Sequence, residues 1–274
     1  MAERRIRRPR ARRHVARESL RRGIYALPSL FTVLNLFFGF WAIIDAVNGH
    51  FERAAWLIIL AGVLDGLDGR IARMMHATSD FGREYDSLAD VVSFGVAPAI
   101  LIYQWGLQET GRWGWTVAFL FLVAGSIRLA RFNVRAQLAD RRYFTGLAIP
   151  GGAGALTLMV LNDPEPVAHP HAIVAVWIFV LAIAVLMVSS IRYRSFKDFN
   201  LRRRWPATAL FAVAVIIAAI AVSPVPVMSV LLGGYILSGP VEAAFRKLRP
   251  ASPARPRLLA SETNLVPPAD SEHP

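Results

Sequence analysis

Four aspartates set in otherwise apolar sequence are the residues of this 274-residue chain best suited to chemistry. Asp65 and Asp68 are three residues apart, and Asp86 and Asp90 are four residues apart. On a helix, either spacing places both carboxylates on one face. A carboxylate within a membrane helix costs about 3 kcal/mol on insertion scales, so such residues tend to mark function. One such aspartate alone could be a helix cap facing water, but four at these spacings favour a shared site.

The chemistry available to this site is that of a hard divalent cation. Four like charges in one pocket repel one another unless cations bridge them. The chain has no cysteine, and its six histidines form no zinc-binding spacing near the aspartates. Oxygen-only ligands suit Mg²⁺ or Mn²⁺, which keep coordination positions open for substrate phosphates. Two such ions could activate an attacking oxygen and neutralise a leaving one.

Small residues and a cation accompany the aspartates. Gly66, Gly69 and Gly82 are unfavourable in helices, but they let a neighbouring helix or a ligand approach closely. Arg73 lies one turn after Gly69, where its guanidinium could neutralise a phosphate or pair with a carboxylate. Alternatively, Arg73 is an arginine that extends to the membrane surface.

The elements that must position these residues are apolar helices. Apolar residues make up 55% of the chain, more than a globule of this size could bury. Measured against the roughly 20 residues that cross a bilayer, the apolar runs give eight candidate spans. These spans cover residues 27–47, 54–75, 88–107, 113–131, 147–162, 171–191, 206–223 and 226–245. We predict an all-α integral membrane protein with eight transmembrane helices.

The charge distribution predicts how the helices are oriented. The formal net charge is +12, and 29 of the 31 lysines and arginines fall on the side of the N-terminus if eight helices cross. Only Arg53 and Arg112 fall on the opposite side. Cytoplasmic loops carry such an excess, so both termini and the aspartates are expected at the cytoplasmic face. The basic N-terminus has no interleaved aromatic residues, which favours contact with membrane lipids over binding of nucleic acid.

Three segments follow from this organisation. Residues 1–26 form a basic cytoplasmic segment, residues 27–249 a transmembrane catalytic domain, and residues 250–274 a tail rich in Pro, Ala and Ser that we predict to be disordered. The first apolar run is too long for a signal peptide and lacks a cleavage site, so we interpret it as a retained span.

The aspartates and their neighbours form one extended motif. It reads Asp65-x-x-Asp68-Gly69-x-x-Ala72-Arg73, then eight residues, then Gly82-x-x-x-Asp86-x-x-x-Asp90. This motif resembles the signature of the CDP-alcohol phosphotransferase family. The resemblance implies a six-helix core, here followed by two C-terminal helices, that binds a CDP-linked lipid or alcohol at its cytoplasmic face. It also implies two bridging divalent ions, displacement of CMP by an acceptor hydroxyl, and a homodimer.

The resemblance also implies a role for each matching residue. Asp65, Asp68 and Asp86 would be metal ligands, and Asp90 would be the general base and a further metal contact. The cytidine and diphosphate would lie against a second set of residues. That set comprises Asp68, Gly69, Ala72 and Arg73, with Ser79 at the edge of the cytosine.

The acceptor alcohol must be inferred from other stretches. Residues 86–99, 128–133, 144–150 and 190–198 resemble bacterial membrane-integral phosphatidylserine synthases. This resemblance implies an inner-membrane enzyme that transfers phosphatidyl from CDP-diacylglycerol to L-serine. Arg128 and Arg131, three residues apart, could bind the serine carboxylate or substrate phosphates, or be two more cytoplasmic-side arginines. Asn133 is a further candidate for lining the acceptor site.

Two alternatives remain at this stage. The same chemistry could serve glycerol 3-phosphate, inositol phosphate or another alcohol. A divalent cation transporter would also place carboxylates in membrane helices. Against a transporter, all four aspartates are expected at one interface, with none midway through the bilayer.

Overall fold

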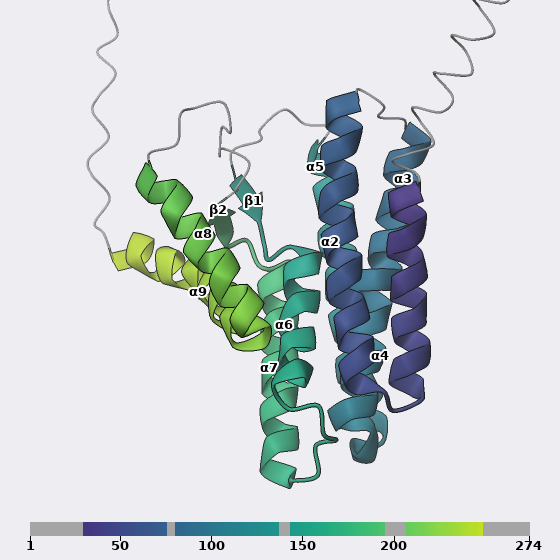
Figure 1. The fold of residues 1–274 in the computed structure, drawn as a ribbon. Coiled ribbons are helices and arrows are strands. Elements are labelled where there is room, and N and C mark those ends of the chain that lie inside the picture. Colours follow the sequence, from purple (N-terminus) through teal and green to yellow (C-terminus); the bar gives the residue numbers. More distant parts are fainter. Residues whose placement is uncertain (1–29, 76–79, 137–142, 195–206, 249–274) are drawn as a thin grey trace, which may run out of the picture.

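The computed structural model describes residues 30–75, 80–136, 143–194 and 207–248, and within these ranges the chain folds into eight helices (Figure 1). The helices are Leu30–Val47, α2 (Phe51–Met75), Asp80–Thr110, α5 (Arg112–Ala136), α6 (Ile149–Asn162), α7 (Pro170–Val188), α8 (Ala207–Val222) and α9 (Pro224–Leu248). Each predicted span overlaps one of them, which confirms the prediction of an all-α protein with eight helices.

The helix Asp80–Thr110 changes its winding along its length. It begins as α3 (Asp80–Asp90), continues as a π-helix, η1 (Val91–Val96), and as α4 (Ala97–Ile102). A second π-helix, η2 (Tyr103–Leu107), and a 3₁₀ turn, η3 (Gln108–Thr110), complete it. Pro98 has no N–H for the carbonyl four residues earlier and its ring crowds that carbonyl, so a wider turn just before it relieves the clash.

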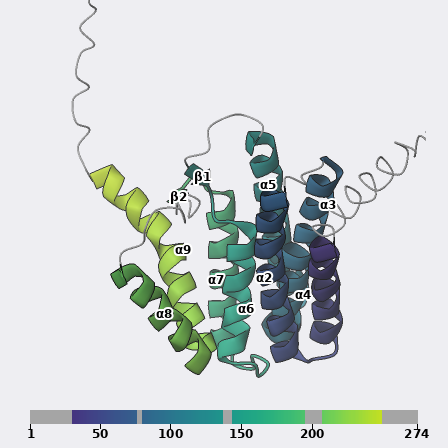
Figure 2. The ribbon, with the colours of Figure 1, turned by 45° about the horizontal axis from the view of Figure 1, so that its top comes forward.

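The first six helices form a bundle, and the last two lie to one side of it. In Figures 1 and 2, α8 and α9 lie on the same side of the other helices, with α9 next to them. Within the bundle, α5 packs on α7 and α2 packs on α6, while α9 reaches the bundle through α6 and α8 packs on α9. This arrangement matches the expected six-helix core with two C-terminal helices.

Close helix contact in the bundle depends on small residues. A Cβ atom on Gly39 would overlap Ser93 of η1, so the helix Leu30–Val47 and η1 meet backbone to backbone. The Ser93 hydroxyl donates a hydrogen bond to the Asn35 carbonyl at 3.0 Å across this contact. Since lipid tails are as apolar as leucine, packing and hydrogen bonds of this kind hold membrane helices together.

Two three-residue strands, one before α6 and one after α7, lie at the end of the bundle where α2 also ends. β1 (Tyr143–Thr145) pairs antiparallel with β2 (Arg192–Arg194) (Figure 1). The turn after β1 needs a positive φ of 80°, which Gly146 supplies, and the Gly146 N–H donates to the Ile191 carbonyl at 2.8 Å. This ribbon could not be predicted from the sequence, because three residues are too few to show strand periodicity.

Tyr193 of β2 connects this ribbon to α9. Its hydroxyl donates to the carbonyl of Ile236 at 3.2 Å, and a Cβ on Gly239 would overlap its ring. Burial, together with the nearby Tyr235, raises the pKa of Tyr193 to about 12, so the hydroxyl keeps the proton that it donates. The C-terminal helices are thereby fixed to the same end of the bundle as the ribbon.

An ion pair closes the turn at the start of α2. The Arg53 guanidinium lies 2.9 Å from Asp45 Oδ1, and His50 Nδ1 lies 3.9 Å from the same oxygen. The His50 N–H also donates to the Asp45 carbonyl at 2.8 Å. Asp45 is only 3% exposed, and Arg53 is the cation that pairs with this buried carboxylate.

The surface of the bundle is that of a membrane protein. Five helical segments are long and apolar enough to cross a bilayer: Leu30–Val47, Asp80–Thr110, Arg112–Val134, Pro170–Val188 and Pro224–Phe245. Large apolar side chains lie exposed along them, including Phe40, Ile178 and Val185. Such extensive apolar exposure suits lipid and not water. The apolar stretches in α6 and α8 are shorter than a full span.

Candidate active site

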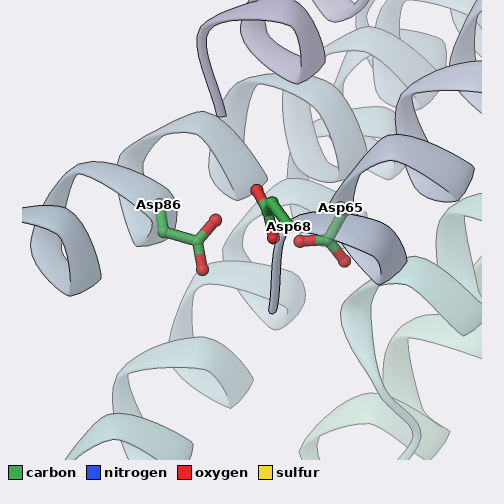
Figure 3. Close-up of side chains that lie close together, drawn as sticks. All are labelled: Asp65, Asp68 and Asp86. Atoms are coloured by element: carbon green, nitrogen blue, oxygen red, sulfur yellow. The ribbon is translucent and has the colours of Figure 1, made fainter. Parts of the chain in front are cut away.

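The hairpin of α2 and α3 brings three of the four aspartates together. Oxygen atoms of Asp65, Asp68 and Asp86 all lie within 4.8 Å of one another. Figure 3 shows Asp86 pointing from one helix toward Asp68 and Asp65 on the other. Only four residues separate the end of α2 from the start of α3, so the helical faces predicted from the two spacings meet across the hairpin.

Asp90 lies next to this cluster and not within it. Its carboxyl group lies close enough to that of Asp65 for their charges to interact. Asp90 follows Asp86 by one helical turn and directly precedes the π-helical turn of η1. π-helical turns occur frequently at functional sites, where they change the direction of nearby side chains.

The donor atoms of this site fit a hard divalent cation. One buried oxygen of Asp86 and one of Asp90 have no hydrogen-bond partner. A buried carboxylate oxygen without a partner is costly, and a cation would satisfy it. In the part of the chain that the structure describes, no lysine or arginine forms an ion pair with any of the four aspartates. The cluster can therefore bind a metal, with all its donors oxygen.

Thr32 is a site residue that was not predicted from the sequence. Its hydroxyl donates a hydrogen bond to Asp68 Oδ2 at 3.2 Å, and Thr32 and Asp68 are 6% and 5% exposed. The contact comes from the helix Leu30–Val47 and orients one metal-ligand candidate. Asn35 lies one turn farther along the same helix and is fully buried. Thr32 and Asn35, a polar pair three residues apart in the first apolar run, could have indicated a site on this helix. Neutral polar residues are, however, common where membrane helices meet.

One face of α2 beside the aspartates is open. A Cβ atom added to Gly66 or Gly69 would meet nothing within 4 Å, so these glycines do not serve helix packing. Of the two uses considered for them, close approach by a ligand is the one this space permits. Ala72 and Arg73 continue α2, but their side chains lie outside the described part of the chain, as does all of Ser79.

Two of the three acceptor candidates on α5 lie next to α3. Arg128 is 8% exposed, and its guanidinium carbon lies 5.2 Å from the centre of the Phe132 ring. Arg128 also lies close to the carboxyl group of Asp90 and to the phenol of Tyr235. The Asn133 amide donates to the Ser87 hydroxyl at 2.9 Å, which ties α5 to the residue after Asp86.

Arg131 has a different partner. Its guanidinium donates a hydrogen bond at 2.7 Å to the carbonyl of Val188, the last residue of α7. A cation at this position also complements the negative end of the helix dipole. The structure thus gives Arg131 a contact with α7, whereas Arg128 lies near Asp90.

The chain is similar to known proteins over most of its length. Residues 25–188 match the model of the CDP-alcohol phosphatidyltransferase family. A CDP-diacylglycerol–serine O-phosphatidyltransferase of Helicobacter pylori (strain J99) is 38% identical over 223 residues, which cover 81% of this chain and 92% of that protein. The enzyme of the same name from Mycobacterium leprae is 34% identical over 237 residues, 84% of this chain and 76% of that protein. Archaetidylserine synthase of Methanothermobacter thermautotrophicus is 36% identical over 170 residues, 61% of this chain and 69% of that protein.

Proposed function

The chain belongs to the CDP-alcohol phosphatidyltransferase family, and from this membership we propose that it transfers phosphatidyl from CDP-diacylglycerol to L-serine, giving phosphatidylserine and CMP. The observation that carries the chemistry is the convergence of Asp65, Asp68 and Asp86 from two helices. The names of the relatives, which specify a serine acceptor, support the choice of alcohol.

Asp65, Asp68 and Asp86 would hold Mg²⁺ or Mn²⁺. We propose that two ions bind, with Asp90 as a further ligand. A bound divalent ion would neutralise the diphosphate charge of the nucleotide lipid. Thr32 fixes the orientation of Asp68 through its hydrogen bond. The unpartnered oxygens of Asp86 and Asp90 provide free donor positions.

The CDP group would lie along the open face of α2. Gly69 leaves room there for a ligand, and Asp68 lies within the same turn of the helix. Ala72 and Arg73 follow one turn later, and Ser79 lies in the short connection to α3. We assign these residues to the cytidine and diphosphate because they match the family motif position by position.

Asp90 would act as the general base. In this step it accepts the proton of the serine hydroxyl as that oxygen bonds to the lipid-linked phosphorus, and the bond from this phosphorus to CMP breaks. Arg128, buried near Asp90, would hold the serine carboxylate in line for the attack. Asn133 would support α3 from α5, and Arg131 remains a candidate for the acceptor or for a lipid phosphate.

We place the enzyme in the bacterial inner membrane with both termini and the active site in the cytoplasm. The distribution of 29 basic residues on one side and two on the other supports this orientation. The basic segment 1–26 and the tail 250–274 lie outside the described residues. We assign residues 27–249, between them, to the transmembrane catalytic domain. We also propose that the chain forms a homodimer and binds no nucleic acid. The mass of the protein in detergent or lipid nanodiscs tests the homodimer.

A panel of acceptors tests the proposed function. The purified chain receives CDP-diacylglycerol with labelled serine, glycerol 3-phosphate or inositol phosphate, and both CMP release and the lipid product are measured. We expect a serine-dependent lipid product. A product from another acceptor would change the alcohol and keep the chemistry. Metal uptake into liposomes without any CMP release would favour a transporter.

A further inference from the structure

Asn35 is a buried polar residue whose side chain has no partner. It lies in the helix Leu30–Val47 and is 0% exposed. In the part of the chain that the structure describes, neither its amide nitrogen nor its amide oxygen has a hydrogen-bond partner. Asparagines in membrane helices usually bond to a neighbouring helix, as the Asn162 amide does when it donates to the Ser229 hydroxyl at 2.9 Å. Two buried polar groups without partners are costly, so helix packing does not account for Asn35.

The backbone contact of Asn35 indicates where its side chain points. The Asn35 carbonyl accepts the hydrogen bond of the Ser93 hydroxyl, and Gly39, one turn later, meets the backbone of Ser93. In an α-helix the carbonyls point toward the C-terminus, whereas the side chains lean toward the N-terminus. The side chain of Asn35 therefore leans away from Ser93 and toward Thr32, whose hydroxyl donates to Asp68.

Asp90 lies at the same depth on the neighbouring helix. The helix Leu30–Val47 and α3 start at the same end of the bundle (Figure 1). Asn35 precedes Gly39 by four residues and Asp90 precedes Ser93 by three, so both lie about one turn nearer to that end than the contact between the two helices. One oxygen of Asp90 is also buried without a hydrogen-bond partner. Unpartnered polar atoms of two helices thus lie at one level of the bundle.

We propose that the Asn35 amide donates a hydrogen bond to the transferred phosphoryl group, at a non-bridging oxygen of the lipid-linked phosphorus. The inference rests on the proposed function, since it needs a reaction centre beside Asp90. In that reaction the serine oxygen bonds to phosphorus and its proton passes to Asp90. The bond from phosphorus to CMP breaks, and its electron pair leaves with CMP.

A neutral donor at this place stabilises charge that shifts during the reaction. A donor that is already in position acts without rearrangement, and it acts most strongly where water is excluded. Asn35 is in such a place, because its side chain is fully buried and no group of the described chain competes for its amide. It also belongs to a third helix, so it adds a contact to the phosphoryl group that α2 and α3 do not provide.

Asn35→Leu tests this inference, and Asn162→Leu is its matched control. Leucine has nearly the shape of asparagine but neither donates nor accepts a hydrogen bond. The control makes the same change at an amide that has partners, the Leu158 carbonyl at 2.6 Å and the Ser229 hydroxyl. Asn35→Ala repeats the test with a side chain small enough for the space. Single-turnover CMP release at saturating substrates, metal-dependent CDP binding and the unfolding temperature are measured for each variant.

We expect Asn35→Leu to lower the rate of single-turnover CMP release by roughly 100- to 1,000-fold, as the loss of one such donor does in other enzymes. CDP binding should be unchanged. The unfolding temperature should equal or exceed that of the unaltered chain, because the substitution removes buried polar groups that have no partner. Asn35→Ala should show the same loss of CMP release. Asn162→Leu should show the opposite pattern, with a lower unfolding temperature and unchanged CMP release.

Wild-type CMP release in Asn35→Leu and Asn35→Ala overturns the inference and leaves the proposed function intact. A slower release in Asn35→Leu that comes with weaker CDP binding or a lower unfolding temperature also overturns it, because Asn35 would then serve the metal site or the packing of the helices. Absence of CMP release from the unaltered chain with every acceptor overturns the proposed function, and the inference with it.

Discussion

Two hairpins share α2, and both bury aspartate, but only one of them supplies its own cation. At the turn before α2, Asp45 is paired with Arg53. At the connection after α2, three aspartates converge, and no described lysine or arginine pairs with them. The start of α2 thus lies beside a carboxylate whose charge is paired with an arginine, and the C-terminal half of α2 carries aspartates whose charges are not paired.

The difference separates a structural charge from a functional one. A buried carboxylate with a paired arginine has satisfied its charge within the chain, and removing the partner mainly costs stability. A cluster left without a cation is destabilising by itself, and it becomes favourable only when something positive binds. Removal of metal and substitutions at the two ends of α2 test this contrast.

Removal of divalent ions should act only on the uncompensated end. Excess EDTA should abolish CMP release and lower the unfolding temperature, and Mg²⁺ or Mn²⁺ should restore both, because the ion binds the folded chain. Asp86→Asn should lose the metal-dependent rise in unfolding temperature, and Asp45→Asn should keep it. Thermal unfolding with and without metal measures this, and full activity in excess EDTA contradicts the proposed metal site.

Asp90→Asn should separate the base from the metal ligands. The amide keeps the size and one acceptor oxygen but cannot take a proton, so single-turnover CMP release should fall by roughly two to four orders of magnitude. Metal-dependent CDP binding should survive, since Asp65, Asp68 and Asp86 remain. Asp65→Asn is the comparison variant, in which CDP and metal binding should weaken together. Wild-type turnover in Asp90→Asn would pass the role of base to another group.

Arg128→Ala should raise the KM for serine by roughly 30-fold or more, because it removes a buried charge-assisted contact. The KM for CDP-diacylglycerol should change much less. Arg131→Ala is the comparison variant on the same helix, and the hydrogen bond of Arg131 to α7 predicts a loss of thermal stability with a smaller change in the KM for serine. Equal losses for both substrates in Arg128→Ala would assign Arg128 to the diphosphate or to structure.

Arg53→Met should lower stability and leave activity unchanged, in contrast to the variants of the aspartate cluster. It leaves Asp45 buried without its cation, and since Arg53 is itself 61% exposed, we expect a loss of only about 1 kcal/mol of stability. The unfolding temperature should fall by a few degrees while kcat and both KM values stay unchanged. The double variant Asp45→Asn/Arg53→Met should recover part of the stability. A change in metal dependence would contradict the division between the two ends.

The features predictable from sequence were those set by local spacing. The lengths of the apolar runs located eight helices, and the spacing within the two aspartate pairs located the faces that meet in the hairpin. Tertiary contacts decided the rest. Thr32 bonds to a residue 36 positions away, and Arg131 bonds to one 57 positions away. No local pattern encodes such partners, nor does it show that the face of α2 at Gly69 stays open.

The π-helical turn Val91–Val96 has a consequence for how the helix Asp80–Thr110 is phased. Each residue of an α-helix advances the chain by about 100°, and a π-turn accommodates an additional residue in a wider turn. A helical wheel drawn through the whole segment would therefore misassign the side on which Asp86 and Asp90 lie relative to the apolar residues after the turn. Deleting one residue within it would convert the wide turn to an ordinary α-turn and leave both aspartates facing α2, whereas a deletion in the α-helical part that follows would change their angle relative to the later residues by about 100°. The wide turn lets one continuous helix keep one angular setting for its carboxylates and another for its membrane neighbours.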